Sequence, residues 1–238
     1  MSSIQNKLLI TVTSGPLIGA AVSSLFISKG FNHVALISRN AIRLGEDVNL
    51  VLKKAKESGN KDVVVKSFVG DVSIPYKITT VLERIVLEFG APEAVVYNAA
   101  VISMGGLGDF TEERLVQEFK VSTVGLYTTA KVIFPKLLER KLVPNSKSTL
   151  IVTGGGVYKS SLPTHLSLSL NKAAQFNLTE NLTKTFEPQG VHVSVVVINK
   201  VITFDDHLAN PARIAQEYWK MYKQEEDKWD RVIDMGYE

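Results

Sequence analysis

Residues 8–19 read Leu8-Leu9-Ile10-Thr11-Val12-Thr13-Ser14-Gly15-Pro16-Leu17-Ile18-Gly19. Their first half is an apolar, β-branched run that is typical of a buried strand, and helical spacing begins at Ile18. Gly15 and Pro16 lie in the turn between them, which opens directly into the helix. Because N–H groups at a helix N-terminus attract phosphate, this strand, turn and helix predict a nucleotide-binding end.

The same alternation continues along the chain. Strand-like apolar runs occupy residues 8–13, 33–38, 63–69, 94–97, 150–153 and 193–198, and a last short strand is expected near 229–235. Helical spacing and end signals predict helices at 18–28, 41–57, 76–89, 112–139, 164–186 and 211–224. The runs are continuously hydrophobic, as in strands buried on both faces of a parallel sheet. We therefore expect one α/β domain over residues 1–238, a Rossmann fold with a doubly wound, mostly parallel sheet of about seven strands and helices on both faces.

Composition narrows the class of protein. With 238 residues and 45% hydrophobic residues, the chain can bury one large core. The net charge of +3 is too small to indicate a nucleic-acid or anionic-membrane partner. There is no cysteine, the four histidines form no metal-ligand spacing, and neither a signal-peptide pattern nor a membrane-length apolar run occurs. We expect a cytoplasmic protein that acts on a small molecule, with no nucleic-acid, membrane or metal partner.

The end of the second expected strand carries information about the cofactor. It reads Ser38-Arg39-Asn40, with Arg43 one turn into the next helix and no acidic residue. An acid here would accept hydrogen bonds from the ribose of NAD, whereas an arginine pairs with a 2′-phosphate. NADP(H) is therefore favoured over NAD, and the alternative is that both arginines are a solvated pair at a helix start.

Two tripeptides follow the third and fourth expected strands, Gly70-Asp71-Val72 and Asn98-Ala99-Ala100. In order and spacing they resemble motifs of the short-chain dehydrogenase/reductase family, and the resemblance covers essentially the whole chain. It implies that Asp71 and Val72 contact adenine and that Asn98 supports the sheet beside the cofactor. The alternatives are that Asp71 caps a helix near Ser73 and that Asn98 satisfies backbone groups.

The resemblance is incomplete in the first turn, where the family usually carries three glycines. The aligned residues are Thr13, Leu17 and Gly19, with Gly15 as an extra glycine. Side chains at such positions obstruct the turn and the approach of a diphosphate. The residues that the resemblance implies as dinucleotide contacts here are Ser14, Gly15, Leu17, Ile18 and Gly19. The alternative is a turn that only shapes the entry into the helix.

The catalytic positions of the family are mostly substituted. Lys172 matches the lysine of the Tyr-x-x-x-Lys pair, but Leu168 stands at the tyrosine, Gly155 at the serine and Ser122 at the asparagine. Leucine delivers no proton to a developing alkoxide, and losing that acid alone costs about 10²–10⁴ in rate. Gly155, in place of the serine of the family, removes a hydrogen-bond donor to the oxyanion as well. Ordinary alcohol dehydrogenation is therefore disfavoured.

Two other residues are candidates to act beside Lys172 in catalysis. Tyr158 follows the glycine run and His165 stands near the start of the Lys172 helix. Histidine has a suitable unperturbed pKa, and a neighbouring lysine is expected to lower the pKa of Tyr158. The alternative is that both are ordinary residues at the rim of the cleft, and that Lys172 is only a ribose contact or a solvated lysine.

The C-terminal part departs from the family too. Residues 196–202 replace the Asn-Pro-Gly turn beside the nicotinamide, and the helix that contains Trp219 resembles a divergent subgroup that lacks the tyrosine. The resemblance also implies a homodimer or homotetramer through the helices that contain Gly125 and Lys172.

Three functions remain open. The first, which we favour, is an NADP(H)-dependent oxidoreductase with altered proton delivery, acting on a protonated imine or using Tyr158, His165 or water. The second is a dinucleotide-binding sensor without turnover. The third is a cofactor-free, non-redox enzyme or scaffold, for which Thr13 and Leu17 are the main evidence.

Overall fold

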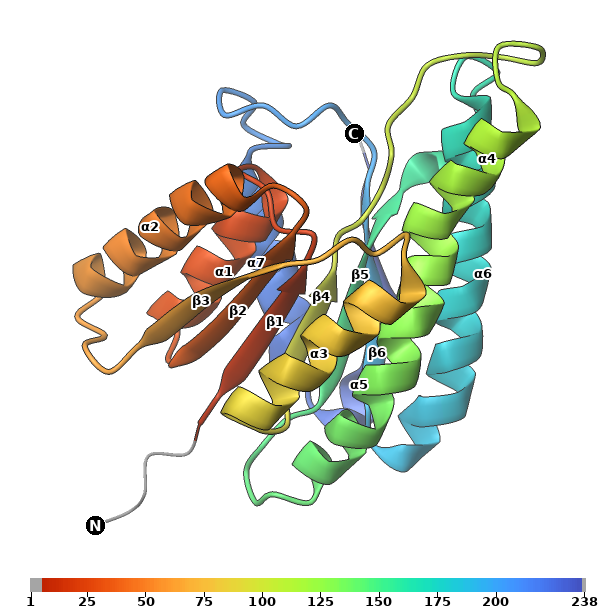
Figure 1. Ribbon diagram of the computed structural model, residues 1–238. Helices are drawn as coiled ribbons and strands as arrows, with labels where there is room; N and C mark the ends of the chain where they lie inside the picture. Colours follow the sequence, from red (N-terminus) through yellow and green to blue (C-terminus); the bar gives the residue numbers. More distant parts are fainter. Residues whose placement is uncertain (1–5, 237–238) are drawn as a thin grey trace.

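The seven strands form one sheet in which every neighbouring pair is parallel, in the order β3-β2-β1-β4-β5-β6-β7 (Figure 1). This computed structural model describes residues 6–236. The strands are β1 Leu8–Val12, β2 His33–Ser38, β3 Val64–Val69, β4 Ala94–Tyr97, β5 Thr149–Gly155, β6 His192–Ile198 and β7 Val232–Met235. The predicted single-domain, doubly wound sheet is confirmed, whereas the ends of the expected domain, residues 1–5 and 237–238, lie outside the described residues.

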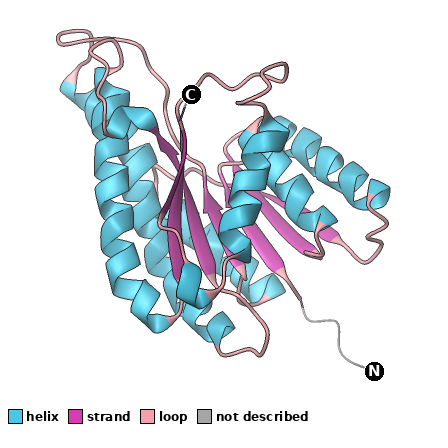
Figure 2. Cartoon of the chain, turned by 180° about the vertical axis from the view of Figure 1, so that it is seen from behind, coloured by secondary structure: helices cyan, strands magenta, loops and turns pink. Residues whose placement is uncertain are grey.

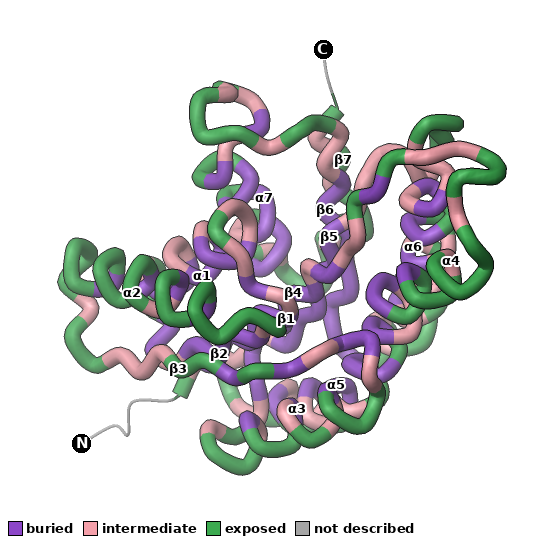
Figure 3. The backbone as a smooth tube through the Cα atoms, turned by 45° about the horizontal axis from the view of Figure 1, so that its top comes forward, coloured by how far each residue is buried: buried purple, intermediate pink, exposed green. Residues whose placement is uncertain are grey.

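Helices cover both faces of the sheet, as Figure 2 shows from behind. On one face lie α1 Ile18–Ser28, α2 Ala41–Glu57 and α7 Pro211–Lys223; on the other lie α3 Pro75–Phe89, α4 Glu112–Phe119, α5 Gly125–Lys141 and α6 Leu166–Phe186. Each face buries its own hydrophobic cluster against the strands, and the exposed residues lie on the outer sides of the helices (Figure 3). Within residues 6–236, no helix is long and apolar enough to span a membrane.

The helix expected over residues 112–139 is interrupted. A π-helical turn, Lys120–Val124, separates α4 from α5. Within this turn the Val121 carbonyl accepts from the hydroxyl of Tyr97, in the sheet below, at 2.6 Å. A Cβ on Gly125 would lie 2.4 Å from that hydroxyl oxygen, so only glycine permits this approach. Single π-turns of this kind are frequent at functional sites.

The order of the strands reverses beside β1, whose two neighbours are β2 and β4. Val12 pairs with Ile37 of β2 and with Tyr97 of β4, so the residues that follow these strands leave the sheet side by side. The loops after β4 and β6 rise from this same carboxyl edge (Figure 1). In open α/β sheets, ligands bind at such a crevice.

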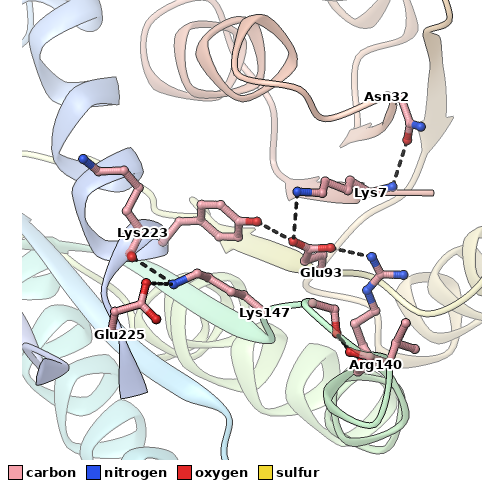
Figure 4. A network of polar contacts seen from close by, with 10 residues as sticks. Lys7, Asn32, Glu93, Arg140, Lys147, Lys223 and Glu225 are labelled. Atoms are coloured by element: carbon pink, nitrogen blue, oxygen red, sulfur yellow. Dashed lines mark hydrogen bonds and ion pairs between the residues drawn. The ribbon is translucent and has the colours of Figure 1, made fainter. Parts of the chain in front are cut away.

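The opposite, amino edge of the sheet is held by a buried ion pair. Glu93, just before β4, is 1% exposed and contacts Arg140 of α5 and the hydroxyl of Tyr222 of α7 (Figure 4). The Nζ atom of Lys7 lies 4.0 Å from the same carboxylate. The network therefore joins helices from both faces to the edge that faces away from the crevice.

Candidate functional site

The ends of β1, β4 and β5 are joined at the crevice by Asn98. Its Nδ2 donates to the Thr13 carbonyl at 3.1 Å, and its Oδ1 accepts from the Thr153 hydroxyl at 2.8 Å. Thr153 also shares a hydrogen bond of 2.6 Å with the hydroxyl of Tyr218, whose pKa is raised by burial. The sequence reasoning did not identify Thr153 or Tyr218. The amide of Asn98 is thus engaged in the sheet.

The nucleotide turn is tightly packed. Thr13 has a φ of +64°, in the left-handed region, which a β-branched side chain adopts only under strain. A Cβ on Gly19 would lie 2.7 Å from the Cα of Ser14, so this glycine lets the first turn of α1 meet the loop. At Gly15 an added Cβ would meet nothing within 4 Å, so the outer side of the turn is open. Leu17 is the residue before α1 and makes no side-chain cap.

A buried acid lies beneath this turn and was missed in the sequence. Asp47 of α2 is 0% exposed, and its Oδ2 accepts from the hydroxyl of Ser14 at 2.7 Å. Burial raises the pKa of Asp47 above its ordinary value, although the Ser14 hydrogen bond opposes that effect. The sequence does contain a signal for it, because Asp47 stands among Leu44, Val51 and Ala55 on the buried face of the helix.

At the end of β2, Arg39 is exposed and makes no hydrogen bond or ion pair with any described residue. Its neighbour Asn40 caps α2 by accepting from the N–H of Arg43 at 3.1 Å. The guanidinium of Arg43 lies 3.3 Å from the carboxylate of Glu46. The two arginines therefore differ, since Arg39 alone presents an uncommitted cation beside the crevice.

Asp71 follows β3 and is engaged by its own loop. Its Oδ1 accepts from the backbone N–H of Ser73 at 2.9 Å and from the Ser73 hydroxyl at 2.7 Å. The next residue, Val72, is 5% exposed, and its carbonyl would lie 2.9 Å from a Cβ on Gly125. The side chain of Asp71 thus shapes the turn that leads into α3.

Lys172 of α6 is almost fully buried. Its ammonium donates to the Thr153 carbonyl at 2.7 Å and to Oε1 of Gln175 at 2.9 Å, and burial lowers its pKa to about 8. A Cβ on Gly155 would lie 3.6 Å from the Cε of Lys172, so the stem of the lysine passes directly beneath that glycine. The alternative of a solvated lysine is therefore wrong.

Gln175 links Lys172 to the π-helical turn. Its Nε2 donates to the carbonyl of Ser122 at 3.1 Å, and the side chain is 1% exposed. The hydroxyl of Ser122 donates back to the Glu118 carbonyl at 2.8 Å and does not reach Lys172. Sequence reasoning missed Gln175, although it stands one helical turn after Lys172.

The contacts of Tyr158 and His165 are with residues other than Lys172. The ring of Tyr158 stacks on Phe176 with centroids 4.1 Å apart, and burial, with Asp234 and Glu180 nearby, raises its pKa. The expectation of a lowered pKa is therefore wrong, because burial raises the pKa of Tyr158 and the nearby charges are acidic. His165 precedes α6, and its Nδ1 lies 3.1 Å from the hydroxyl of Thr164.

The segment after β6 closes over the glycine run. The side chain of Asn199 occupies the space above Gly156, where an added Cβ would lie 1.6 Å from its Oδ1. The Nδ2 of Asn199 donates to Asp234 of β7, at 2.5 Å. A larger residue at position 156 would therefore displace the side chain of Asn199.

The model of the short chain dehydrogenase family matches residues 7–213. The chain belongs to this family. Its crevice, with strand order reversing beside β1, occupies the place where this family of folds binds its cofactor.

Three curated relatives show the degree of similarity in sequence. A short chain dehydrogenase of Passalora fulva, claC, is 25% identical over 84% of this chain and 70% of the relative. A probable tetrahydroxynaphthalene reductase of Zymoseptoria tritici is 29% identical over 57% of this chain, and versicolorin reductase 1 of Dothistroma septosporum is 26% identical over 72%. The matches span only 48% and 60%, respectively, of those two reductases.

Solved structures match the fold over nearly the whole chain. An alcohol dehydrogenase from Thermococcus sibiricus, complexed with 5-hydroxy-NADP, superposes with a TM-score of 0.83 at 20% identity, covering 97% of this chain and 96% of that one. An NADH-dependent reductase complexed with NAD also has a TM-score of 0.83, at 15% identity, covering 97% and 95%. At these identities the likeness concerns the fold.

Proposed function

We propose that this short-chain dehydrogenase is an NADP(H)-dependent oxidoreductase whose proton does not come from the usual tyrosine of the family. The observation that carries the cofactor choice is Arg39, an exposed and uncommitted guanidinium at the end of β2. A guanidinium there pairs with a 2′-phosphate, and no acid is present to accept from an unphosphorylated ribose. The reductase names of the curated relatives agree with the reaction class.

The crevice fits a dinucleotide at its adenosine end. The outer side of the turn at Gly15 is open, and Gly19 holds α1 against the loop. Residues Ser14, Gly15, Leu17, Ile18 and Gly19 would border the diphosphate, Arg39 the 2′-phosphate, and Asp71 with Val72 the adenine. When bound, NADPH supplies the hydride.

The tetrad is degenerate in this proposal, as in the divergent subgroup that lacks the tyrosine and serine. Leu168 and Gly155 carry no proton donor, so another group must protonate the developing alkoxide. Lys172 retains its proton at neutral pH, since its lowered pKa is about 8, and its two contacts use two of its three N–H groups. Tyr158 and His165 are the alternative donors, and Tyr158 stays protonated because its pKa is raised.

Calorimetric titration with NADPH, NADP, NADH and NAD tests the cofactor. We expect micromolar binding of NADP(H), weaker binding of NAD(H), and a loss of about tenfold for NADPH in Arg39→Ala, with NADH unchanged. Arg43→Ala is the matched control, since that guanidinium is paired with Glu46. An equal loss of NADPH affinity in both variants would contradict the role of Arg39. If no dinucleotide binds at millimolar concentration, the cofactor-free function is the one that remains.

The lack of a proton donor at Leu168 and Gly155 also favours a second function, a dinucleotide sensor without turnover. The pair Leu168→Tyr and Gly155→Ser restores the donors, and Gly155 accepts a Cβ at ordinary contact distances. If NADPH oxidation with a panel of aromatic ketones appears only in the restored protein, the native chain is a sensor. If the native protein itself oxidises NADPH, the same assay is applied to Lys172→Met, Tyr158→Phe and His165→Ala. The variant that loses activity identifies the proton donor.

We also propose that the chain is a homodimer or homotetramer. A hollow of about 420 Å³ between the π-turn, α5 and α6 is lined mainly by apolar atoms, among them those of Phe119, Tyr127 and Leu178. Tyr127 is 57% exposed and Phe119 40% exposed. Light scattering on the native protein and on Tyr127→Glu tests this, with a monomeric variant expected. A cytoplasmic location stays a prediction.

A further inference from the structure

The carboxyl of Asp47 is buried with too few partners for a charged group. One oxygen, Oδ2, accepts from the Ser14 hydroxyl, and the other, Oδ1, has no hydrogen-bond partner among the described residues. The residue is 0% exposed and Ser14 is 4% exposed, so the carboxyl is shielded from bulk solvent. A buried acid in this condition tends to take up a proton.

The surroundings supply little compensation. On its own helix Arg43 lowers the pKa of Asp47 and Glu46 raises it, and both of these side chains are largely exposed and pair with each other. The helix packed against it, α1, carries no titratable side chain, and the adjoining ends of β1 and β2 add only the exposed Arg39. Burial therefore dominates, and the pKa of the carboxyl is raised.

Two positions of the turn above have no backbone N–H left for a ligand. Pro16 has no N–H, and the N–H of Ser14 is already donated to the Ile37 carbonyl at 2.7 Å. The hydroxyl is therefore the one donor that Ser14 itself has left to offer to a phosphate. While Asp47 is ionised, that hydroxyl proton is held by the carboxylate.

We infer that Ser14 and Asp47 couple dinucleotide binding at this turn to the uptake of one proton. This inference rests on the proposed function. When Asp47 takes a proton from solvent, its O–H donates to the Ser14 oxygen, and the Ser14 hydroxyl is released to donate to a phosphate oxygen. The same proton removes a buried negative charge beside the diphosphate. No other bond changes.

Calorimetry of NADPH binding between pH 6 and 9, in buffers of different ionisation enthalpy, tests the coupling. We expect net uptake approaching one proton, and an affinity that falls by about tenfold per pH unit once Asp47 is ionised in the free protein. In Asp47→Asn the amide donates to Ser14 as the neutral acid does, so affinity stays high and uptake from this group vanishes. The 2′-phosphate titrates near pH 6 in both proteins, at about the value for a phosphate monoester, and cancels in the comparison.

Glu46→Gln is the matched control, because it removes an exposed acid from the preceding position and leaves the pair intact. It should keep the proton uptake. If the native protein binds NADPH with the same pH profile as Asp47→Asn, the coupling is overturned and the proposed function stands. If Asp47→Asn binds NADPH where the native protein does not, the coupling is supported. If neither protein binds NADPH at any pH, the proposed function and this inference both fail.

Discussion

Two buried acids, one at each edge of the sheet, have opposite surroundings. Glu93 at the amino edge is met by Arg140, Tyr222 and Lys7, contributed by both helical layers and by the chain entering β1 (Figure 4). Asp47 at the carboxyl edge has one hydroxyl partner and one oxygen without any among the described residues. The first carboxylate is paired with an arginine, whereas the second has no paired cation from residues 6–236 within its buried site and its pKa is raised by burial. The difference agrees with a structural role for the amino edge and with the ligand site that we propose at the carboxyl edge.

The largest expected effect lies at the amino edge. Arg140→Met should lower the free energy of unfolding by about 3–5 kcal/mol, because it leaves Glu93 buried without its main counter-charge. Urea unfolding measures this. Adding Glu93→Leu should recover most of the loss, since the pair is then replaced by apolar groups. A loss below about 1 kcal/mol in the single variant would show that Glu93 is not held by its charge partner.

A smaller loss is expected at the nucleotide turn. Gly19→Ala should cost about 1–3 kcal/mol, because its Cβ would meet the backbone of Ser14 at 2.7 Å and neither group can move aside. Gly15→Ala, four residues earlier, meets nothing within 4 Å and should leave the unfolding free energy within about 0.5 kcal/mol. Equal effects of the two variants in urea unfolding would refute the tight packing of the turn.

Lys172 should make stability depend on pH. Its pKa is about 8 in the folded protein and 10.5 ordinarily, so between these values the unfolded chain binds more protons. The free energy of unfolding should therefore rise with pH, by about 1 kcal/mol between pH 8 and 9, and this contribution is lost as pH falls through 8. Lys172→Met should lack the rise, whereas Lys159→Met, which removes an exposed lysine, should keep it. Parallel curves for all three proteins would contradict the buried ammonium.

The sequence predicted the elements well because the apolar runs and helix ends are local signals. The strands at 33–38 and 94–97 and the helices at 18–28 and 41–57 have the predicted bounds. The π-turn at Lys120–Val124 was not predicted, and its Val121 carbonyl accepts from the hydroxyl of Tyr97, which belongs to another element. Long-range contacts of this kind leave no periodicity.

The sequence predicted the positions of the candidate site residues better than their burial and contacts. Lys172 could be placed from its motif, but its contact with Gln175 and its burial depend on how α6 meets the π-turn. The pKa of Tyr158 was predicted in the wrong direction, because its burial depends on the fold and because the charges near it in space are acidic. Asp47 could have been found, since an acid in a row of buried apolar positions is rare and needs a partner.

The smallest effect concerns strain at the first residue of the turn. Thr13→Gly relieves a β-branched side chain at φ +64°, which costs about 1–3 kcal/mol, but glycine also gives freedom to the unfolded chain. We expect a net gain of about 0.5–1 kcal/mol in urea unfolding, with tighter binding of NADPH because one of the two side chains expected to obstruct the diphosphate is removed and only Leu17 remains. Asn145→Gly is the control, at φ +59°, where asparagine tolerates the conformation and the gain should be smaller. If Thr13→Gly weakens NADPH binding while stabilising the fold, the threonine contributes to the ligand, and the substitution in this turn is a functional feature of the nucleotide end.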